Sequence, residues 1–91
     1  MPTQITKDES DGQVCFRVEG EMLVEDALVL ERLVDSEDGD VEVVIDLADL
    51  DFLDSDAAQV LRRLETENGV RLEGTEIFLQ SSINLAERMS N

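Results

Sequence analysis

The stretch that decides the fold is Val43–Ala58, which reads VVIDLADLDFLDSDAA. It opens on three consecutive β-branched residues, 43–45, and such an uninterrupted apolar run is typical of a central strand that is covered on both faces. The run predicts a strand over Val41–Leu47. A short segment then leads away from the strand, and either Asp54 or Ser55 is placed to cap the start of a helix. The stretch therefore predicts a buried strand, a short connection and a helix.

Hydrophobic periodicity predicts the elements that precede this stretch. Residues Gly12–Glu19 alternate between apolar and polar and predict a strand with Val14, Phe16 and Val18 on one face. Residues 3–7 are expected to pair with it through a turn at residues 9–12, and Gly20 is expected to end it. Residues Glu25–Val34 predict a helix whose apolar stripe comprises Ala27, Leu28, Leu30, Leu33 and Val34.

The elements that follow complete an alternating pattern. The helix after Ser55 has apolar positions at Ala57, Ala58, Leu61 and either Leu64 or Glu65. It either closes at Asn68-Gly69 or runs to Leu72 with Gly74 beyond its end. A strand is predicted over Thr75–Gln80 and a last helix over Ile83–Met89, capped by Ser81 or Ser82. The resulting order, β-β-α-β-α-β-α, predicts an α/β domain with a mixed sheet and helices packed on it.

Length and charge limit the possible functions. The 91 residues are expected to form one domain, 1–91. The chain carries 23 acidic and 7 basic residues, a net charge of −16, which disfavours binding to nucleic acid or to an anionic bilayer. The charge either attracts a basic protein partner or only keeps the chain soluble. No apolar stretch approaches the ~20 residues of a membrane helix, and residues 1–11 lack a hydrophobic signal region, so a cytoplasmic protein without membrane insertion is expected.

The chain has few residues that could perform catalysis or bind a metal. It contains no histidine and one cysteine, Cys15, which is expected to be a buried thiol; zinc sites with the usual ligands and Cys–His or Ser–His pairs are excluded. Ten acidic residues and no basic one lie between Asp35 and Asp56, so a Mg²⁺ or Ca²⁺ site or a receiver-like phosphoacceptor pocket is conceivable. The EF-hand pattern fails because Asp54 stands where glycine is required, and a receiver needs a late lysine, whereas Lys7 is the only lysine. A solvated acidic loop is the favoured interpretation, with no metal, cofactor or catalytic residue.

Ser55 is the residue most open to a functional interpretation. A serine at a helix start is accessible, and phosphorylation there would add roughly −1.5 to −2 charges. The alternative is a plain helix cap. Arg62 and Arg63 are adjacent and cannot share one helical face, so at least one of them is expected to be only solvated. The other, two helical turns or ~11 Å from the helix start, is a candidate for the rim of a binding surface around Ser55, and Arg62 is the one selected. Met22 and Leu23 belong either to such a surface or to the core.

The same stretch resembles a known family. The pattern IDLxxLxFLDS over residues 45–55, followed by AAxVL over residues 57–61, is similar to the signature of STAS domains, the anti-sigma factor antagonists and their relatives. Residues 14–23 resemble the family's early strand, and residues 74–85 its last strand and the start of its last helix. The resemblance implies a small mixed four- to five-stranded sheet with helices packed mainly on one face.

The resemblance also implies a function, that of a non-enzymatic protein-binding switch. In anti-sigma factor antagonists the residue that matches Ser55 is phosphorylated by a partner serine kinase that is also the anti-sigma factor. The candidate partner-binding residues are Asp54, Ser55, Asp56, Ala57, Arg62 and Met22. Asp56 and Ala57 stand where the family has a small residue and a glycine. This departure keeps an alternative open, in which the chain is a constitutive adaptor subunit of a bacterial lipid (ABC) transporter or of a stress-signalling assembly.

Overall fold

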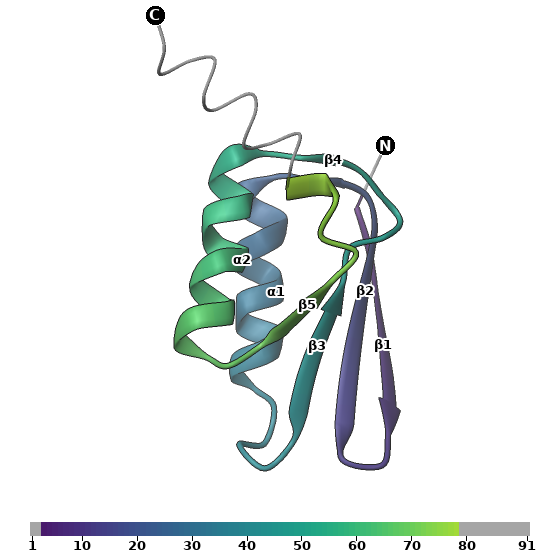
Figure 1. The fold of residues 1–91 in the computed structure, drawn as a ribbon, viewed down its shortest axis with the longest axis vertical. Helices are drawn as coiled ribbons and strands as arrows, with labels where there is room; N and C mark the ends of the chain where they lie inside the picture. Colours follow the sequence, from purple (N-terminus) through teal and green to yellow (C-terminus); the bar gives the residue numbers. More distant parts are fainter. Residues whose placement is uncertain (1–2, 79–91) are drawn as a thin grey trace, which may run out of the picture.

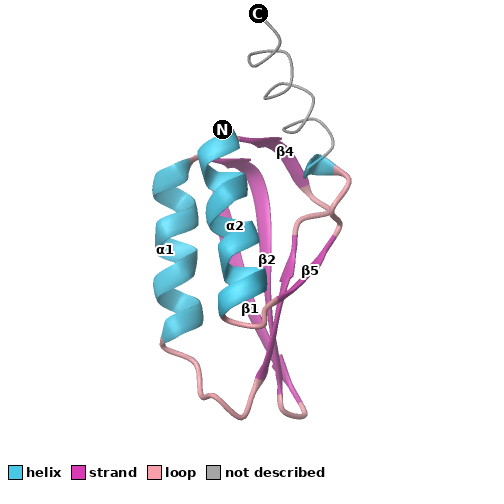
Figure 2. Ribbon diagram, turned by 60° about the vertical axis from the view of Figure 1, so that its left-hand side comes forward, coloured by secondary structure: helices cyan, strands magenta, loops and turns pink. Residues whose placement is uncertain are grey.

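The computed structural model describes residues 3–78, and within them two helices cover one face of a five-stranded mixed sheet (Figures 1 and 2). The strand order is β1-β2-β3-β5, and β4 pairs with the far end of β2. This arrangement confirms the predicted fold class. The strands are β1 (Gln4–Ser10), β2 (Gln13–Met22), β3 (Glu42–Asp46), β4 (Leu50–Leu53) and β5 (Arg71–Glu73). The helices are α1 (Val24–Asp35) and α2 (Ser55–Glu67).

Strands β1 and β2 form an antiparallel hairpin, with Gln4 opposite Glu19 and Ser10 opposite Gln13. The turn between them consists of two residues, Asp11 and Gly12, whose φ angles are 41° and 78°. Two-residue turns with positive φ at both positions match the right-handed twist of the strands they join. The hairpin confirms the predicted pairing, and its turn is shorter than the four residues expected.

Strand β2 has two parallel partners in succession. Its first half, Gln13–Arg17, pairs with β3, and its last residues, Gly20–Met22, pair with β4. The register shifts between Gly20 and Glu21, and Gly20 has a φ of 87° that a residue without a Cβ adopts readily. The prediction that Gly20 ends the strand was therefore wrong, because the glycine bends the strand toward a second partner. Strand β4 was not predicted at all.

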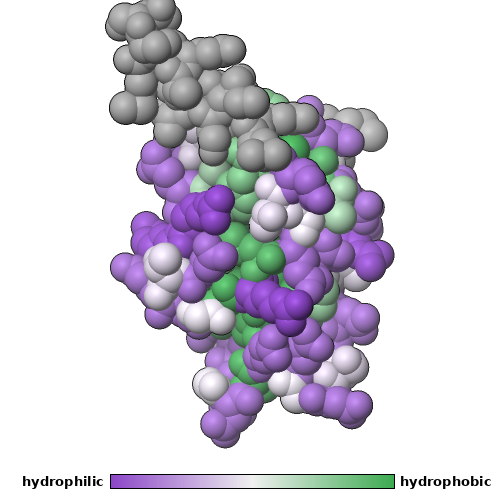
Figure 3. Space-filling model, viewed as in Figure 1, coloured by the Kyte–Doolittle hydropathy of each residue, from purple (hydrophilic) through white to green (hydrophobic). Residues whose placement is uncertain are grey.

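Strand β3 is central, as predicted. It lies between β2 and β5 and is parallel to both. Val43, Val44 and Ile45 are 9%, 1% and 0% exposed, so the strand is covered on both faces. Val43 and Ile45 face the helices, whereas Val44 has Cys15 and Arg71 as its cross-strand neighbours on the other face. Hydrophobic residues are visible between the two layers as a band along the line between α2 and β5 (Figure 3).

The two helices bury narrow apolar stripes. In α1 the buried residues are Ala27, Leu30 and Val34, three and four positions apart, while Leu28 and Leu33 remain 41% and 36% exposed. The predicted stripe was therefore too wide, because each of these two leucines lies one position from the buried line and points to a flank. The buried residues of α2 are Ala57, Ala58, Val60, Leu61 and Leu64, and the helix ends before Asn68 and Gly69, the first of the two predicted ends.

The predicted strand Thr75–Gln80 was wrong over its described part. The strand is Arg71–Glu73, and Gly74 follows it with a φ of 67°. The backbone there passes so close to Ala48 that a Cβ on Gly74 would lie 2.3 Å from the Ala48 nitrogen. The chain turns at this contact, and Ile77 and Phe78 begin a helical turn and pack into the core. The predicted helix Ile83–Met89 and its cap lie outside the described residues.

Substitution of Val43 or Ile45 by aspartate is predicted to unfold the domain. An unpaired charge buried in the core costs several kcal/mol, a large part of the ~5–15 kcal/mol that stabilises a small domain. The matched control is Val29→Asp, because Val29 is 48% exposed. Circular dichroism melting should show a folded Val29→Asp variant and an unfolded Val43→Asp variant. A wild-type melting temperature for Val43→Asp would contradict the central position of β3.

The close approach at Gly74 predicts a difference between two glycine variants. Gly69 and Gly74 both have a φ of 67°, but only at Gly74 would an added Cβ meet another part of the backbone. Gly69→Ala should cost the ~1–2 kcal/mol of a left-handed alanine. Gly74→Ala should cost more, because the Ala48 backbone must also move. Urea denaturation measures the free energy of unfolding of both variants. Equal decreases would show that the contact with Ala48 does not affect stability.

Candidate functional site

The connection between β4 and α2 is held in place by Asp54. Its side-chain Oδ1 accepts a hydrogen bond of 2.9 Å from the Asp56 backbone N–H, which makes Asp54 the N-cap of α2. Its own backbone N–H donates to the carbonyl oxygen of Met22 at 3.0 Å, so the end of β4 is fastened to the end of β2. Of the two predicted caps, Asp54 is therefore the one that forms.

Ser55 is the first residue of α2 and is half-buried. Because the cap hydrogen bond belongs to Asp54, the Ser55 hydroxyl is not needed to start the helix. Within residues 3–78 this hydroxyl has no hydrogen-bond partner. Ser55 therefore presents a free hydroxyl at a helix start. This hydroxyl is available to bond to, or react with, a group of another molecule.

Both helices begin at the same end of the sheet (Figure 1), and acidic side chains gather there. Asp54 and Asp56 lie at the start of α2, and Glu25 and Asp26 lie in the first turn of α1. Asp26 accepts a hydrogen bond of 3.0 Å from the Leu23 backbone N–H. Carboxylates are stabilised at helix N-termini by free N–H groups and by the helix dipole. The two helix starts thus allow a concentration of negative charge at this end of the molecule.

The structure separates the predicted surface residues into two groups. Asp54, Ser55 and Asp56 lie together and retain exposed surface. Met22 and Ala57 are both 0% exposed. Their assignment to a partner-binding surface is corrected, because strand β2 continues past Gly20 and places Met22 in the core, and because the first buried position of α2 is Ala57.

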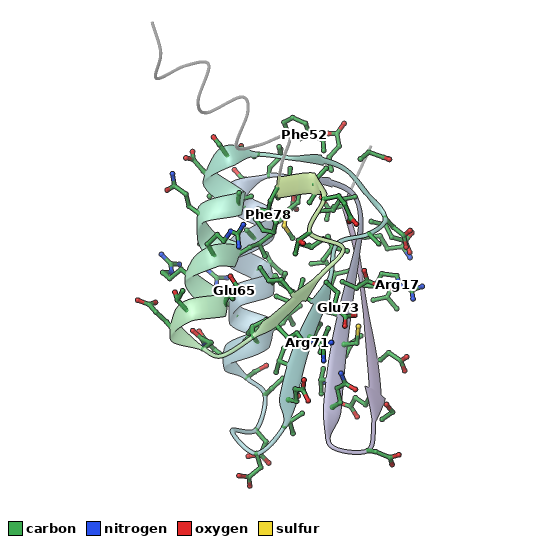
Figure 4. The ribbon with its side chains drawn as sticks, viewed as in Figure 1. Arg17, Phe52, Glu65, Arg71, Glu73 and Phe78 are labelled. Atoms are coloured by element: carbon green, nitrogen blue, oxygen red, sulfur yellow. The ribbon has the colours of Figure 1, made fainter. Side chains whose placement is uncertain are left out.

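Arg62 is exposed but faces another part of the molecule. Its guanidinium lies 4.3 Å from the centre of the Phe78 ring, and its Nη1 lies 3.3 Å from Glu65 Oε1. Figure 4 shows Glu65 toward the far end of α2 from Ser55, and Phe78 between the helix and the sheet. Arg63, in contrast, joins the two helices through a contact of 2.6 Å between its Nη2 and Glu31 Oε2. In the described residues neither arginine forms an ion pair with a carboxylate beside Ser55.

Two exposed apolar side chains at the same end enlarge the site. Phe52 is 46% exposed and Leu23 is 44% exposed. The sequence left open whether Leu23 belongs to a binding surface or to the core, and its exposure agrees with the surface. The exposure of Phe52 was not predicted from the sequence. A phenylalanine next to a leucine looks like a core residue, and only the recognition of β4 as a strand, with side chains that alternate between its faces, shows that the two point in opposite directions. Figure 4 shows Phe52 at the end of the molecule that carries the start of α2.

The acidic run does not converge on one point. Arg17 approaches Asp46 and Asp49 at 3.8 and 3.9 Å, and Asp46 also accepts a hydrogen bond from the Ala48 backbone N–H. Asp54 is engaged as a helix cap. In the part of the chain that the structure describes, no three acidic or cysteine side chains are grouped so that they could hold a metal ion.

Cys15 is half-buried on the sheet face opposite the helices, because its neighbours Val14 and Phe16 point into the core. The expectation of a buried thiol is corrected accordingly. Desolvation, together with the charges of Asp46 and Glu73, raises the pKa of the Cys15 thiol. A thiol with a raised pKa is a weak nucleophile at neutral pH, so Cys15 is a poor candidate for catalysis.

A hollow of about 280 Å³ opens at the opposite end of the molecule, between the β1–β2 turn and the loop after α1. Glu9 and Glu37 line it, and Lys7 Nζ contacts them at 3.0 and 2.8 Å. The lysine offsets part of the nearby negative charge and ties β1 to the loop after α1, which is a structural role. Over the described residues, no helix is long and apolar enough to cross a membrane.

Comparison with solved structures finds a similar fold in 14 chains, three of which illustrate the similarity. An anti-sigma factor antagonist STAS domain from Rhodobacter sphaeroides is 21% identical with a TM-score of 0.60, and the match covers 82% of this chain and 89% of that one. An uncharacterized protein with a SpoIIAA-like fold from Shewanella loihica PV-4 is 21% identical with a TM-score of 0.58, covering 96% and 78%. A protein named Mglu is 29% identical with a TM-score of 0.56, but the match covers 75% of this chain and only 18% of that one.

The family was identified by sequence. No curated protein matches the chain. The model of the STAS domain family, however, matches residues 4–87, which include every strand and helix described above. The chain therefore belongs to the STAS domain family.

Proposed function

We propose that the chain is a non-enzymatic, protein-binding regulatory switch of the anti-sigma factor antagonist kind. Ser55 is the phosphorylation site in this proposal, and the partner is a serine kinase that is also the anti-sigma factor. The observation that carries the proposal is the free hydroxyl of Ser55 at the first residue of α2, in a chain of this family. The similarity to an anti-sigma factor antagonist STAS domain supports it.

Phosphorylation of Ser55 would change the surface without disturbing the fold. A phosphate adds roughly −1.5 to −2 charges, and a helix start tolerates such a group. The cap hydrogen bond from Asp56 N–H to Asp54 remains in place, because the Ser55 hydroxyl takes no part in it. A partner that packs on this hydroxyl would have to accommodate a larger group and desolvate its charge beside Asp54 and Asp56. Binding is therefore the property that the modification would change.

The two departures from the family pattern have different consequences. Ala57 is 0% exposed, so its methyl group points into the core and does not obstruct a kinase that approaches Ser55. Asp56 is exposed and places a fixed negative charge next to Ser55. Repulsion between this charge and a phosphate is of the order of 1 kcal/mol or less in a solvated position, which does not prevent the modification.

The fixed charge of Asp56 favours a second candidate function. A permanently acidic helix start suits a partner that binds without regulation, as in a constitutive adaptor subunit of a bacterial lipid (ABC) transporter or of a stress-signalling assembly. The partner would then be a transporter subunit in place of a kinase. In both proposed functions, residues 1–91 form a single cytoplasmic domain that binds a protein and not nucleic acid.

Two substitutions of Ser55 distinguish the switch from the adaptor. Ser55→Ala should fold and bind like the wild type, because the helix cap is provided by Asp54. Ser55→Glu should also fold, since a carboxylate suits a helix start, but it should bind the partner at least about tenfold more weakly, equivalent to about 1.4 kcal/mol. Affinity for the co-purified partner is measured by calorimetry, and folding is measured by circular dichroism.

Asp54→Ala provides the control for stability in this comparison. Loss of its cap should lower the free energy of unfolding by ~0.5–2 kcal/mol, whereas Ser55→Ala should be nearly neutral. If Ser55→Glu folds and binds as tightly as the wild type, the switch is refuted and the adaptor function is favoured.

The chain is also predicted to bind no divalent metal tightly. In the acidic run, Asp46 and Asp49 are engaged with Arg17 and Asp54 is engaged as a helix cap, so these carboxylates offer no preformed cage. Calorimetric titration with Mg²⁺, Ca²⁺ and Mn²⁺ should show no site tighter than about millimolar, the weak end of the range for calcium modules. Micromolar binding that is abolished by Asp49→Ala or Asp54→Ala would contradict this.

A further inference from the structure

Phe52 and Leu23 are the large apolar side chains left exposed at the end of the molecule that carries both helix starts. Five such side chains are exposed among the described residues. The other three, Leu28, Val29 and Leu33, lie along the solvent side of α1. Phe52 precedes Asp54 by two residues. Leu23 directly follows Met22, whose carbonyl oxygen accepts the hydrogen bond from the Asp54 N–H.

The pairing of β2 with β4 brings these two side chains together. Glu21 lies opposite Phe52, and the hydrogen bond from the Asp54 N–H to the Met22 carbonyl continues the pairing as far as Leu23. The backbone of Leu23 is still extended, with φ −96° and ψ 171°. Because side chains alternate along extended chains and Glu21 lies opposite Phe52, Leu23 and Phe52 emerge on the same side as diagonal neighbours.

Carboxylates without basic partners lie close to this apolar pair along the chain: Glu25 follows Leu23 by two residues, Asp51 precedes Phe52, and Asp56 lies in the first turn of α2. Glu25, Asp51 and Asp56 are exposed, and within residues 3–78 none of them forms an ion pair with lysine or arginine. Five of the basic residues in the described chain are engaged with other carboxylates: Lys7 with Glu9 and Glu37, Arg17 with Asp46 and Asp49, Arg62 with Glu65, Arg63 with Glu31 and Glu67, and Arg71 with Glu42 and Glu73. The sixth, Arg32, lies in the last turn of α1, at the opposite end of that helix from Glu25. Among residues 3–78, the negative charge at this end therefore has no basic side chain paired with it.

We infer that the partner docks on this surface through a basic amphipathic segment, which places an apolar side chain on the Leu23–Phe52 pair and lysine or arginine side chains against Glu25 and Asp51. Asp56, next to Ser55, is left unpaired in the complex, so a phosphate on Ser55 still meets a like charge there. The inference rests on the proposed function, because it names the chemistry of the partner for the surface around Ser55. Complementary charge raises the rate and specificity of association, and a central apolar contact supplies most of the binding energy. An acidic segment or an anionic membrane would be repelled by the same carboxylates.

A titration followed by NMR tests where such a segment binds. The probe is a short amphipathic peptide of lysine and leucine, added to the full chain labelled with ¹⁵N. Shift changes are expected at residues 21–25 and 50–57. A lysine–serine peptide of equal charge should bind at least about tenfold more weakly, and a glutamate–leucine peptide should not bind. Shift changes centred on the exposed side of α1 or on the acidic turn at residues 36–40 would overturn the inference.

Matched substitutions test the apolar pair. Phe52→Ala and Leu23→Ala should each lower the affinity for the lysine–leucine peptide by about five- to tenfold, the effect of losing a central apolar contact. Leu28→Ala and Val29→Ala, at 41% and 48% exposure, are the controls and should leave it unchanged. Equal losses in all four variants, or no loss in the first two, would refute the docking role of the pair.

A charge reversal completes the test. Asp51→Lys should weaken peptide binding, whereas Asp38→Lys, in the distant loop after α1, should do so much less. The outcome is separable from that of the phosphorylation switch. Loss of peptide binding in Phe52→Ala, with Ser55→Glu still binding the native partner tightly, would support this surface and refute the switch. The reverse pattern would refute this surface and leave the switch intact.

Discussion

The structure depends on one strand, β2, that pairs in parallel with β3 along its first half and with β4 along its last residues. A single straight strand could not serve both partners in this way, and the bulge at Gly20 provides the bend. The bend carries Met22 into the core and brings the end of β4 against the end of β2. The positions of both helix starts follow from this arrangement, because α1 begins directly after β2 and α2 directly after β4.

The shared origin of the helices accounts for the electrostatics of the site. Two helix N-termini at the same end of the sheet stabilise several carboxylates, and these carboxylates are left without basic partners among the described residues. The cap is formed by Asp54, so the hydroxyl of Ser55 is released from any structural task. The fold thus supplies a surface with a free hydroxyl, an acidic rim and an apolar pair, and the rest of the domain serves to hold these groups in position.

The parts of the fold that sequence could predict are those set by local periodicity. The run at residues 43–45 identified the central strand, the alternation of Val14, Phe16 and Val18 identified the core face of β2, and the Asp54-Ser55 pair located a helix start. What could not be predicted depends on contacts between distant segments. Strand β4 exists because β2 bends toward it, and the turn at Gly74 exists because the chain meets Ala48 there. Neither contact leaves a periodic signal in the sequence.

The same division applies to the candidate site. Asp54, Ser55 and Asp56 are consecutive, so their proximity follows from the sequence itself. The burial of Met22 and Ala57 and the exposure of Phe52 are set by the β2–β4 pairing and by the side of α2 that faces the sheet. The position of Arg62 over the Phe78 ring likewise depends on the turn after β5. The surface is formed by the ends of two strands and the starts of two helices. It can be recognised only when the positions of these four elements are known.

The central claim is that Ser55 is the residue through which binding is controlled. The most direct measurement is phosphopeptide mass spectrometry of the chain, isolated with its bound partner from its native cells and then incubated with ATP. The account predicts a phosphate on Ser55 and release of the partner. A complex that persists with Ser55 unmodified, or a phosphate on a different residue that accompanies release, would contradict it.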